Sequence, residues 1–245
     1  MKTCQILGVN IAVTNMEETV KYLEDHISEL RGKYITVCNG HTSVMAYEDK
    51  AYRKVQNSAA LSLPDGEPLS IVSRRRGHKE AQRVTGPDLM EEMFHAGQAG
   101  NGLRHYFYGG SQDTLDTLKE ILQKKYPKLQ IAGMYSPPFR KLTKEEKQAD
   151  IERINVSKAD IIWIGLGAPK QENWMYENKG KLSGVSIGVG AGFDYHAGKL
   201  KRAPRWIQKI SMEWFVRLLQ EPKRLWKRYL VTNVKFIWYT WREKK

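Results

Sequence analysis

The chain has few cysteines and no long apolar run. Cys4 and Cys38 are the only cysteines among 245 residues, too few for a disulfide framework or a zinc site. No stretch reaches the roughly 18 apolar residues that a membrane-spanning helix needs. The first residues also lack the basic segment and sustained apolar run of a signal peptide. These absences predict a protein of the reducing cytoplasm without a membrane-spanning segment.

Signatures of several enzyme classes are missing as well. A dinucleotide-binding fingerprint would place glycine at position 170, where this chain has Lys170, so a dehydrogenase or epimerase is only a distant alternative. The sequence contains neither a Walker A motif nor an Asp-x-Asp pair of the kind that holds a divalent ion on a sugar nucleotide. Glu92 and His95 are more typical of an ordinary helix surface than of a ligand pair. Cationic side chains would then have to stabilise any diphosphate leaving group.

Positive charge gathers in the last fifty residues. The formal net charge of the chain is +13. Residues 196–245 hold 14 Lys and Arg against three Glu, together with five of the seven Trp, whereas residues 1–195 are nearly neutral. This contrast predicts two parts, an α/β catalytic domain in residues 1–195 and a basic, Trp-rich helical appendage in residues 196–245.

The residues of this appendage leave three interpretations open. Trp206, Ile210 and Trp214 fall on one face at helical spacing, among Lys and Arg. Basic amphipathic helices rich in Trp suit the headgroup layer of an anionic membrane. The aromatic residues could instead pack on the rest of the protein, or Arg and Trp could bind single-stranded nucleic acid.

Strand-length apolar runs alternate with glycine turns and amphipathic helices along the body. This alternation is typical of a parallel sheet covered by helices on both faces. We therefore predict an α/β fold with a mainly parallel, Rossmann-like sheet flanked by helices. The predicted strands are residues 4–11, 34–38, 59–64, 105–108, 128–134, 160–164 and 185–189. The predicted helices begin near Thr14 or Asn15, near Pro68 and Pro87, and at Thr143. Two further helices begin at Thr42 and Ser111, whose side chains can cap them.

A carboxylate follows one of these strands. Asp65 stands in Leu63-Pro64-Asp65-Gly66, directly after a short run of small and apolar residues. Open α/β folds bind ligands and carry out chemistry at the carboxyl ends of their parallel strands. Asp65 is therefore a candidate catalytic base. The alternative is that Pro-Asp-Gly only forms a β-turn.

Glycine pairs follow three other predicted strands. They are Gly109 with Gly110, Gly165 with Gly167, and Gly190 with Gly192. Glycine allows backbone N–H groups to approach a phosphate closely, and the N-terminus of a following helix adds a favourable dipole. A nucleoside diphosphate is the expected ligand, although glycine can also serve only to make tight turns between strand and helix.

Several motifs together match the pattern of one family. The block Pro169-Lys170-Gln171-Glu172 follows a glycine turn, and Glu213-Trp214 and Glu221-Pro222 stand in the basic tail. Over essentially its whole length the chain resembles the bacterial WecG/TagA/CpsF glycosyltransferases, which make cell-surface polysaccharides and the linkage units of wall teichoic acid. The other motifs that carry the resemblance are Asn39, Leu63-Pro64-Asp65-Gly66, Val84-Thr85-Gly86-Pro87-Asp88, Gly109-Gly110, Tyr126-Pro127, Gly165-Leu166-Gly167-Ala168, Gly190 through Asp194, Arg202-Ala203-Pro204, Arg217 and Arg224.

The resemblance implies a peripheral enzyme at the cytoplasmic face of the cell membrane. It would transfer a sugar from a UDP donor to a polyprenyl-diphosphate-linked sugar, with inversion and without a metal ion or cofactor. In the best understood branches of the family the UDP donor carries N-acetylmannosamine or its uronic acid. The alternative for this chain is a different UDP-hexose or UDP-uronic acid, used to make capsule or exopolysaccharide. The implied partners are these two substrates and an anionic membrane surface, but no nucleic acid. The sequence leaves the oligomeric state open, with a homo-oligomer that hides apolar surface as one alternative.

The resemblance also assigns roles to residues. Asp65 would be the general base that takes the proton of the attacking acceptor hydroxyl, and Asn39 would hold the donor sugar or the acceptor nearby. Arg217 and Arg224 would swing in with the tail to stabilise the diphosphate. The remaining residues expected to bind substrate are Gly66, Gly109, Gly110, Gly165, Gly167, Gln171, Glu172, Gly190 and Asp194.

One departure from the family pattern concerns Val37. Some members carry threonine at this position, two residues before Asn39, so a hydroxyl contact to substrate is lost here. Either Thr36 or Thr42 takes over this contact, or the protein uses a different donor. The sugar is therefore less well defined by the sequence than the class of reaction.

Overall fold

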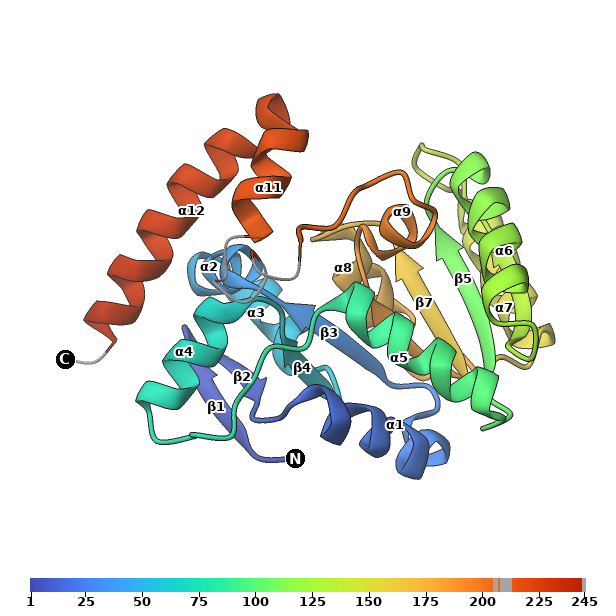
Figure 1. Cartoon of the computed structure of the whole chain (residues 1–245), viewed down its shortest axis with the longest axis horizontal. Coiled ribbons are helices and arrows are strands. Elements are labelled where there is room, and N and C mark those ends of the chain that lie inside the picture. The colour runs from blue at the N-terminus through green and yellow to red at the C-terminus, as the bar shows by residue number, and fades with distance from the viewer. Residues whose placement is uncertain (205–206, 208–212, 244–245) are drawn as a thin grey trace.

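A six-stranded parallel sheet forms the centre of the molecule (Figure 1). The computed structural model describes residues 1–204, 207 and 213–243, without the side chains of residues 213, 224 and 227–229. The strands lie in the order β4-β3-β8-β7-β5-β6, and every neighbouring pair is parallel. Their bounds are β3 Tyr34–Cys38, β4 Leu61–Pro64, β5 Arg104–Gly109, β6 Gln130–Tyr135, β7 Ile161–Gly165 and β8 Val185–Gly188. The predicted fold class is confirmed.

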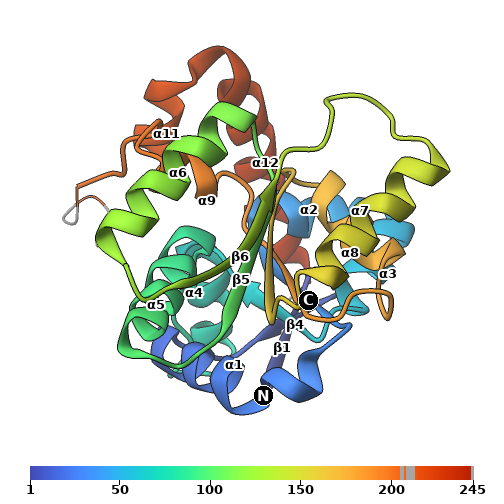
Figure 2. The same ribbon diagram turned by 90° about the vertical axis from the view of Figure 1, so that its right-hand side faces the viewer.

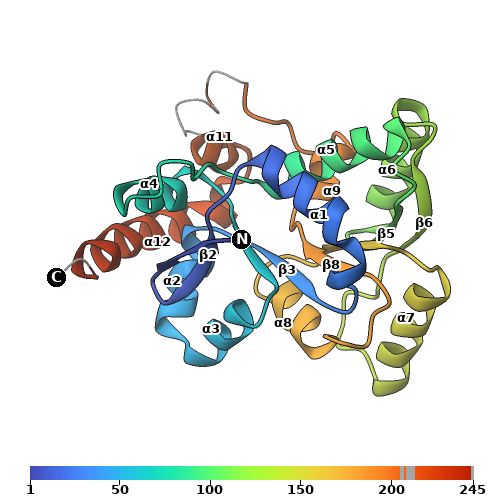
Figure 3. The same ribbon diagram turned by 90° about the horizontal axis from the view of Figure 1, so that it is seen from below.

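Helices cover both faces of this sheet (Figures 2 and 3). One face carries α1 Met16–Leu30, α5 Gly86–Ala99, α6 Gln112–Lys125 and α9 Gly192–His196. The opposite face carries α3 Lys50–Asn57, α7 Lys144–Val156 and α8 Lys170–Glu177. Two further helices, α2 Gly40–Glu48 and α4 Glu67–Arg75, lie beside the β4 end of the sheet.

Strand β7 shows why the strands read as continuous apolar runs. Ile161 and Trp163 enter the core cluster under α5 and α6, whereas Ile162 and Ile164 enter the cluster under α7 and α8. All four side chains are 0% exposed. A strand that is buried on both faces has no polar side of its own, so apolar residues occupy every position.

Side-chain caps begin several helices where the sequence predicted them. Asn15, Ser111 and Thr143 each accept a backbone N–H in the first turn of α1, α6 and α7. The predicted cap at Thr42 is wrong, because Asn39 caps α2 instead. Thr42 completes a capping box, with its hydroxyl oxygen accepting the Asn39 N–H at 2.9 Å.

The predicted first strand, residues 4–11, is wrong. Two antiparallel strands form there, β1 Thr3–Ile6 and β2 Val9–Ala12, outside the central sheet. Leu7 and Gly8 make the turn with φ values of 51° and 78°, the pair of positive angles typical of a tight two-residue hairpin. Because Leu7 is itself buried, the apolar pattern runs through the turn and conceals it.

Two helices, α11 Glu213–Gln220 and α12 Pro222–Arg242, follow near the end of the chain. Helix α12 lies along α2 (Figure 1). Phe236 is 6% exposed and joins the core cluster next to α2, and Lys235 Nζ donates to Glu48 Oε1 at 2.7 Å. Among the helices that the structure describes, none is long and apolar enough to cross a membrane.

Candidate active site

The carboxyl ends of the six parallel strands lie along one side of the sheet, which we call the carboxyl edge (Figure 1). Loops after neighbouring strands are therefore neighbours in space. Taken from β4 to β5, the candidate residues in these loops are Asp65, Asn39, Gly190, Gly167 and Gly110. The candidate base thus stands near one end of a row, and the glycine turns occupy the rest of it.

Asp65 and Asn39 touch each other. Asn39 Nδ2 donates to Asp65 Oδ2 at 3.3 Å. Asn39 Oδ1 accepts the backbone N–H groups of His41 and Thr42, at 3.0 and 3.2 Å, as the cap of α2. The cap occupies the amide oxygen and leaves the amide nitrogen for the carboxylate. The start of α2 therefore orients Asn39 toward the candidate base.

Two of the glycine turns pack against each other. Gly110 N donates to Gly165 O at 3.1 Å. A Cβ on Gly109 would lie 2.7 Å from the carbonyl carbon of Gly165, and a Cβ on Gly165 would lie 2.7 Å from the Phe193 ring. Close packing is therefore sufficient to explain glycine at positions 109 and 165.

Gly167 and Gly190 instead border open space. Their φ values are 76° and 56°, in the region that favours glycine. Apart from the glycine and its two chain neighbours, no described atom lies within 4 Å of the place where a Cβ would be on either residue. Gly66, beside Asp65, also has a positive φ of 89° where it precedes α4. The open turns at Gly167 and Gly190 can approach a phosphate closely.

Gln171 and Glu172 lie beneath the edge, at the start of α8. Gly190 N donates to Gln171 Oε1 at 3.0 Å, and Gln171 Nε2 donates to Glu172 Oε1 at 2.9 Å. The two residues are 4% and 1% exposed. Burial raises the pKa of the Glu172 carboxyl, and its hydrogen bond from Gln171 opposes this rise only in part. Glu172 therefore reaches the open turn only through Gln171.

Polar side chains converge at the β5 end of the carboxyl edge. The Thr114 hydroxyl donates to Asp194 Oδ1 at 3.3 Å, and Lys199 Nζ donates to the same hydroxyl oxygen at 2.9 Å. The Ser136 hydroxyl donates to Gly110 O at 2.7 Å. Asp194 and Gly110 are thereby joined to α6 and to the loop after β6.

Arg217 extends this end of the site with a residue from α11. Its Nη1 donates to the Tyr195 hydroxyl at 3.2 Å, and its Nη2 lies 3.6 Å from a Glu221 carboxylate oxygen. Tyr195 directly follows Asp194, so the C-terminal helices reach the predicted nucleotide site. Arg224 belongs to α12, but its side chain lies outside the described residues.

Acidic and imidazole side chains do not gather into a metal site in the described part of the chain. No group of three or more His, Cys, Asp or Glu is arranged there to hold an ion. In α5, His95 lies against Tyr126 with their polar atoms 3.5 Å apart. Glu92 and His95 both lie on α5, but they do not belong to any cluster of metal ligands in the described part of the chain.

Comparison with known proteins identifies the family. The model of the glycosyl transferase WecG/TagA/CpsF family matches residues 4–245. The chain belongs to this family. It is accordingly a glycosyltransferase, and the match extends over both the sheet and the C-terminal helices.

Curated relatives agree with this class of enzyme. The N-acetylglucosaminyldiphosphoundecaprenol N-acetyl-beta-D-mannosaminyltransferase of Bacillus subtilis (strain 168) is 32% identical over 233 residues, which are 94% of this chain and 88% of the relative. Enzymes with the same name from Bacillus spizizenii and Staphylococcus aureus (strain MW2) are 28% and 27% identical. The matched segments cover 94% and 90% of this chain, and 88% and 85% of the two relatives.

The sequence did not reveal a contact between two WecG-family motifs. Arg202 Nη1 donates to Asp88 Oδ1 at 2.5 Å, and the Thr85 hydroxyl donates to Asp88 Oδ2 at 2.6 Å. Burial acts to raise the pKa of Asp88, but these two hydrogen bonds lower it overall. Both motifs were visible in the sequence, yet 114 residues separate the partners.

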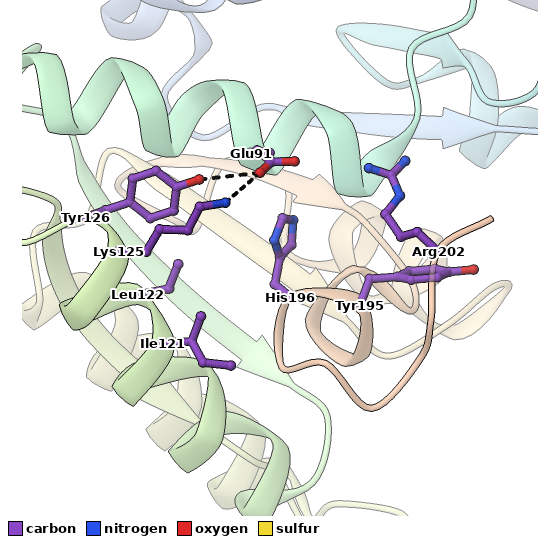
Figure 4. A pocket seen from close by; sticks show the side chains of 8 residues that line it. All are labelled: Glu91, Ile121, Leu122, Lys125, Tyr126, Tyr195, His196 and Arg202. Atoms are coloured by element: carbon purple, nitrogen blue, oxygen red, sulfur yellow. Dashed lines mark hydrogen bonds and ion pairs between the residues drawn. The ribbon is translucent and has the colours of Figure 1, made fainter. Parts of the chain in front are cut away.

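Arg202 also lines a cavity of about 210 Å³ between α5, α6 and α9 (Figure 4). Across it, Lys125 Nζ donates to Glu91 Oε1 at 2.8 Å, so the opposite wall is closed by an ion pair. The remaining lining residues are Ile121, Leu122, Tyr126, Tyr195 and His196. Tyr195, which directly follows Asp194 in the chain, is one of these lining residues. Nothing in the sequence indicated the cavity.

Neither threonine near Val37 has a free hydroxyl. Thr36 is 0% exposed, and its hydroxyl donates to Ser62 Oγ at 2.9 Å. The hydroxyl of Thr42 serves the capping box of α2. The departure from the family pattern at Val37 is therefore not compensated by a neighbouring threonine in this conformation.

Proposed function

We propose that this glycosyltransferase moves N-acetylmannosamine, or a closely related sugar, from a UDP donor to a polyprenyl-diphosphate-linked sugar. The observation that carries the proposal is the row along the carboxyl edge, in which the Asp65–Asn39 pair shares one edge with the open turns at Gly167 and Gly190. The relatives support the acceptor class, since their name specifies N-acetylglucosaminyldiphosphoundecaprenol. Another UDP-hexose or a UDP-uronic acid is the alternative donor, and the uncompensated change at Val37 keeps it in consideration.

In the proposed reaction Asp65 takes the proton of the acceptor hydroxyl while the oxygen attacks the anomeric carbon. The bond from the anomeric carbon to the diphosphate oxygen breaks in the same displacement, and UDP leaves with the electron pair. Attack from the face opposite UDP inverts the anomeric configuration. Asn39 keeps the carboxylate in position through its 3.3 Å hydrogen bond.

The leaving diphosphate needs positive potential farther along the row. The open turn at Gly167 lies directly before the N-terminus of α8, where backbone N–H groups and the helix dipole favour a phosphate. The turn at Gly190 gives the phosphate room, while its own Gly190 N–H is donated to Gln171. The Arg217 guanidinium, held beside Tyr195, adds a positive charge. Fixed dipoles and cations of this kind stabilise the charge that develops on a leaving group. This scheme requires no metal ion.

The proposal includes docking on the anionic inner face of the membrane through α12. Leu225 and Phe236 are buried on the side of α12 that packs against the body. The opposite side is apolar and exposed, and its residues are Trp226, Leu230, Val231, Val234, Ile237, Trp238 and Trp241. Packing on the body thus explains only part of the apolar tail. An exposed apolar face within a basic segment suits a headgroup layer better than it suits nucleic acid.

The deciding experiment supplies the full-length protein with detergent-solubilised polyprenyl-diphosphate-N-acetylglucosamine and a panel of UDP-sugars. Mass spectrometry should show the lipid extended by one sugar with only one or two members of the panel. Bound UDP without product would contradict the acceptor that we propose. A folded protein that binds no UDP would overturn the proposed reaction as a whole.

A further inference from the structure

A chain of hydrogen bonds leads from the core to the open turn after β8. Gly190 N donates to Gln171 Oε1 at 3.0 Å, and Gln171 Nε2 donates to Glu172 Oε1 at 2.9 Å. The first link joins the turn after β8 to α8, and the second lies within α8. Solvent is excluded from this region, since Gln171 is 4% and Glu172 1% exposed. The turn therefore rests on a side chain that is itself held by a buried carboxyl.

The orientation of the Gln171 amide matters for this support. A backbone N–H can only donate, so the end of the amide that faces Gly190 has to be the oxygen. If the amide were reversed, its NH₂ group would oppose the Gly190 N–H, and a buried donor would lose its partner. Glu172 Oε1 accepts from the other end and thereby selects the orientation that serves the turn.

The surroundings of Glu172 favour a neutral carboxyl in this role. Burial raises its pKa, and interactions with Gln171 and Tyr52 offset the rise only partly. No described Lys or Arg forms an ion pair with it, and its Oε2 is buried without a hydrogen-bond partner among the described atoms. The Tyr52 hydroxyl accepts from Gln56 Nε2 at 2.8 Å. Cys38 is uncharged as well, because burial raises the pKa of its thiol to about 11.

We propose that Glu172 is a positioning residue, which acts through Gln171 to hold the turn at Gly190 in the shape required for nucleotide binding. Its own carboxyl does not touch substrate, because Gln171 lies between it and the open turn. The link from this turn to nucleotide affinity rests on the proposed function. The link from Glu172 to the turn itself does not.

Two substitutions distinguish the role of Glu172 as a hydrogen-bond acceptor from a role of its negative charge. Glu172→Gln keeps a neutral oxygen that can accept from Gln171 Nε2. Glu172→Met has a similar volume and no such acceptor. It leaves the buried Gln171 Nε2 without its acceptor, so its melting temperature is measured to confirm that the variant is folded. Glu177→Met is the matched control, since Glu177 lies on the same helix with a side chain that is 59% exposed.

Hydrogen exchange, followed by mass spectrometry on peptides that cover residues 185–195, measures the turn without any substrate. In Glu172→Met the Gly190 amide should exchange about fivefold to tenfold faster, the effect of losing one buried hydrogen bond. Glu172→Gln and Glu177→Met should exchange like the wild type. Unchanged exchange in Glu172→Met would overturn the proposal, and Glu172→Ala supplies the same comparison if the Met variant does not fold.

Titration with UDP then tests the link to the nucleotide. The affinity of Glu172→Met should fall about fivefold to tenfold, with the KM for the donor rising more than kcat falls, whereas Glu172→Gln should lose clearly less affinity than Glu172→Met. Equal losses in the Gln and Met variants would show that the charge is required and would refute positioning by a neutral acceptor. A wild-type protein that fails to bind UDP would instead contradict the proposed function, while the exchange experiment still decides the role of Glu172.

Discussion

The contact between Asp65 and Asn39 joins the candidate base to the start of a helix. Asn39 uses its amide oxygen to cap α2 and its amide nitrogen to hold Asp65. One side chain therefore stabilises the fold locally and positions the candidate base. The two tasks can be separated by substitution, because they use different atoms.

Asp65→Asn removes the proposed base and keeps the size of the side chain. We expect kcat to fall by about 10²-fold to 10⁴-fold, the range typical of losing a general base, with UDP affinity nearly unchanged. Mass-detected transfer and UDP titration measure the two quantities. Full activity in a folded Asp65→Asn variant would exclude this residue as the base.

Asn39→Ser retains a capping oxygen but loses the donor to Asp65. Its free energy of unfolding should match that of the wild type, whereas Asn39→Ala should lose about 1 kcal/mol with the cap. Both variants should have a lower kcat. Asn15→Ala is the control, because Asn15 caps a different helix, α1, and its loss should lower stability alone. Chemical denaturation and transfer assays distinguish these outcomes, and a fully active Asn39→Ser would contradict the positioning of Asp65 by Asn39.

His105 predicts a pH dependence of stability. Its ring accepts from Trp163 Nε1 at 3.0 Å through Nδ1, and burial lowers its pKa from 6.5 to about 4. The unfolded chain therefore binds a proton that the folded chain resists. The contribution of His105 to stability is complete above pH 6.5 and decreases as the pH falls from 6.5 toward 4, by up to about 1.4 kcal/mol per pH unit.

His105→Asn keeps an acceptor near the Nδ1 position but cannot titrate in this range. Urea denaturation at pH 7 and pH 5 should show a smaller difference in unfolding free energy for this variant than for the wild type. An equal difference would mean that other groups cause the pH dependence.

Among the elements, the strands of the central sheet were the most predictable. Except for the edge strand β6, they are short and largely buried on both faces, so a continuous apolar run marks them in the sequence. The hairpin in residues 3–12 was missed because a buried leucine occupies the turn. The break between α2 and α3 depends on Asp49, which ends the first helix and caps the second, and it was not predicted.

The order of the strands could not be predicted in the same way. Asp65 and Asn39 were each singled out, but their contact exists only because β3 and β4 are neighbours. Glycine at positions 109 and 165 suggested a ligand site, whereas packing against a neighbouring turn and against Phe193 is sufficient to explain it. Such contacts depend on which segments the fold brings together, and local sequence carries little of that information.

Helix α12 can be tested through one of its exposed side chains. Ile237 is 68% exposed on the apolar face, so Ile237→Glu should weaken binding to vesicles of phosphatidylglycerol by about tenfold or more, through lost apolar burial and charge repulsion. Val156→Glu is the matched control, because Val156 is 79% exposed at the end of α7. Sedimentation with vesicles measures the binding. Equal binding by both variants, together with a loss of dimers in Ile237→Glu, would assign this face to a second copy of the chain.

At the scale of the whole molecule, the C-terminal helices are tied to the body at several points. Besides the contacts of α12 with α2, Arg76 Nη2 donates to Glu243 Oε2 at 2.8 Å and Leu7 N donates to the same oxygen at 3.1 Å. The boundary that we predicted at residue 195 separates a nearly neutral segment from a basic, Trp-rich one. The C-terminal helices nevertheless pack against the rest of the protein.

A chain that ends at Pro204 should keep the central sheet but unfold at a lower temperature, because removal of Phe236 uncovers apolar surface near α2. Its turnover on the lipid-linked acceptor should be nearly abolished. Circular dichroism and the transfer assay measure these effects, and Arg217→Ala in the full chain separates the loss of the diphosphate contact from the loss of docking. Undiminished turnover of the shortened chain would refute both roles of the tail.

The order of the strands also fixes the distance between Asp65 and the glycine turn after β5. Four strand spacings separate β4, with Asp65, from β5, with Gly110, which amounts to about 19 Å at the usual distance between strands. In the proposed reaction the diphosphate would lie over the open turns after β7 and β8 and the rest of the nucleotide toward β5, so the width of the sheet would set the distance from the nucleotide to Asp65. A nucleoside monophosphate sugar, shorter by one phosphate, would hold its anomeric carbon back from the base. The width of a β-sheet would thus reject such donors before any side chain reads the sugar.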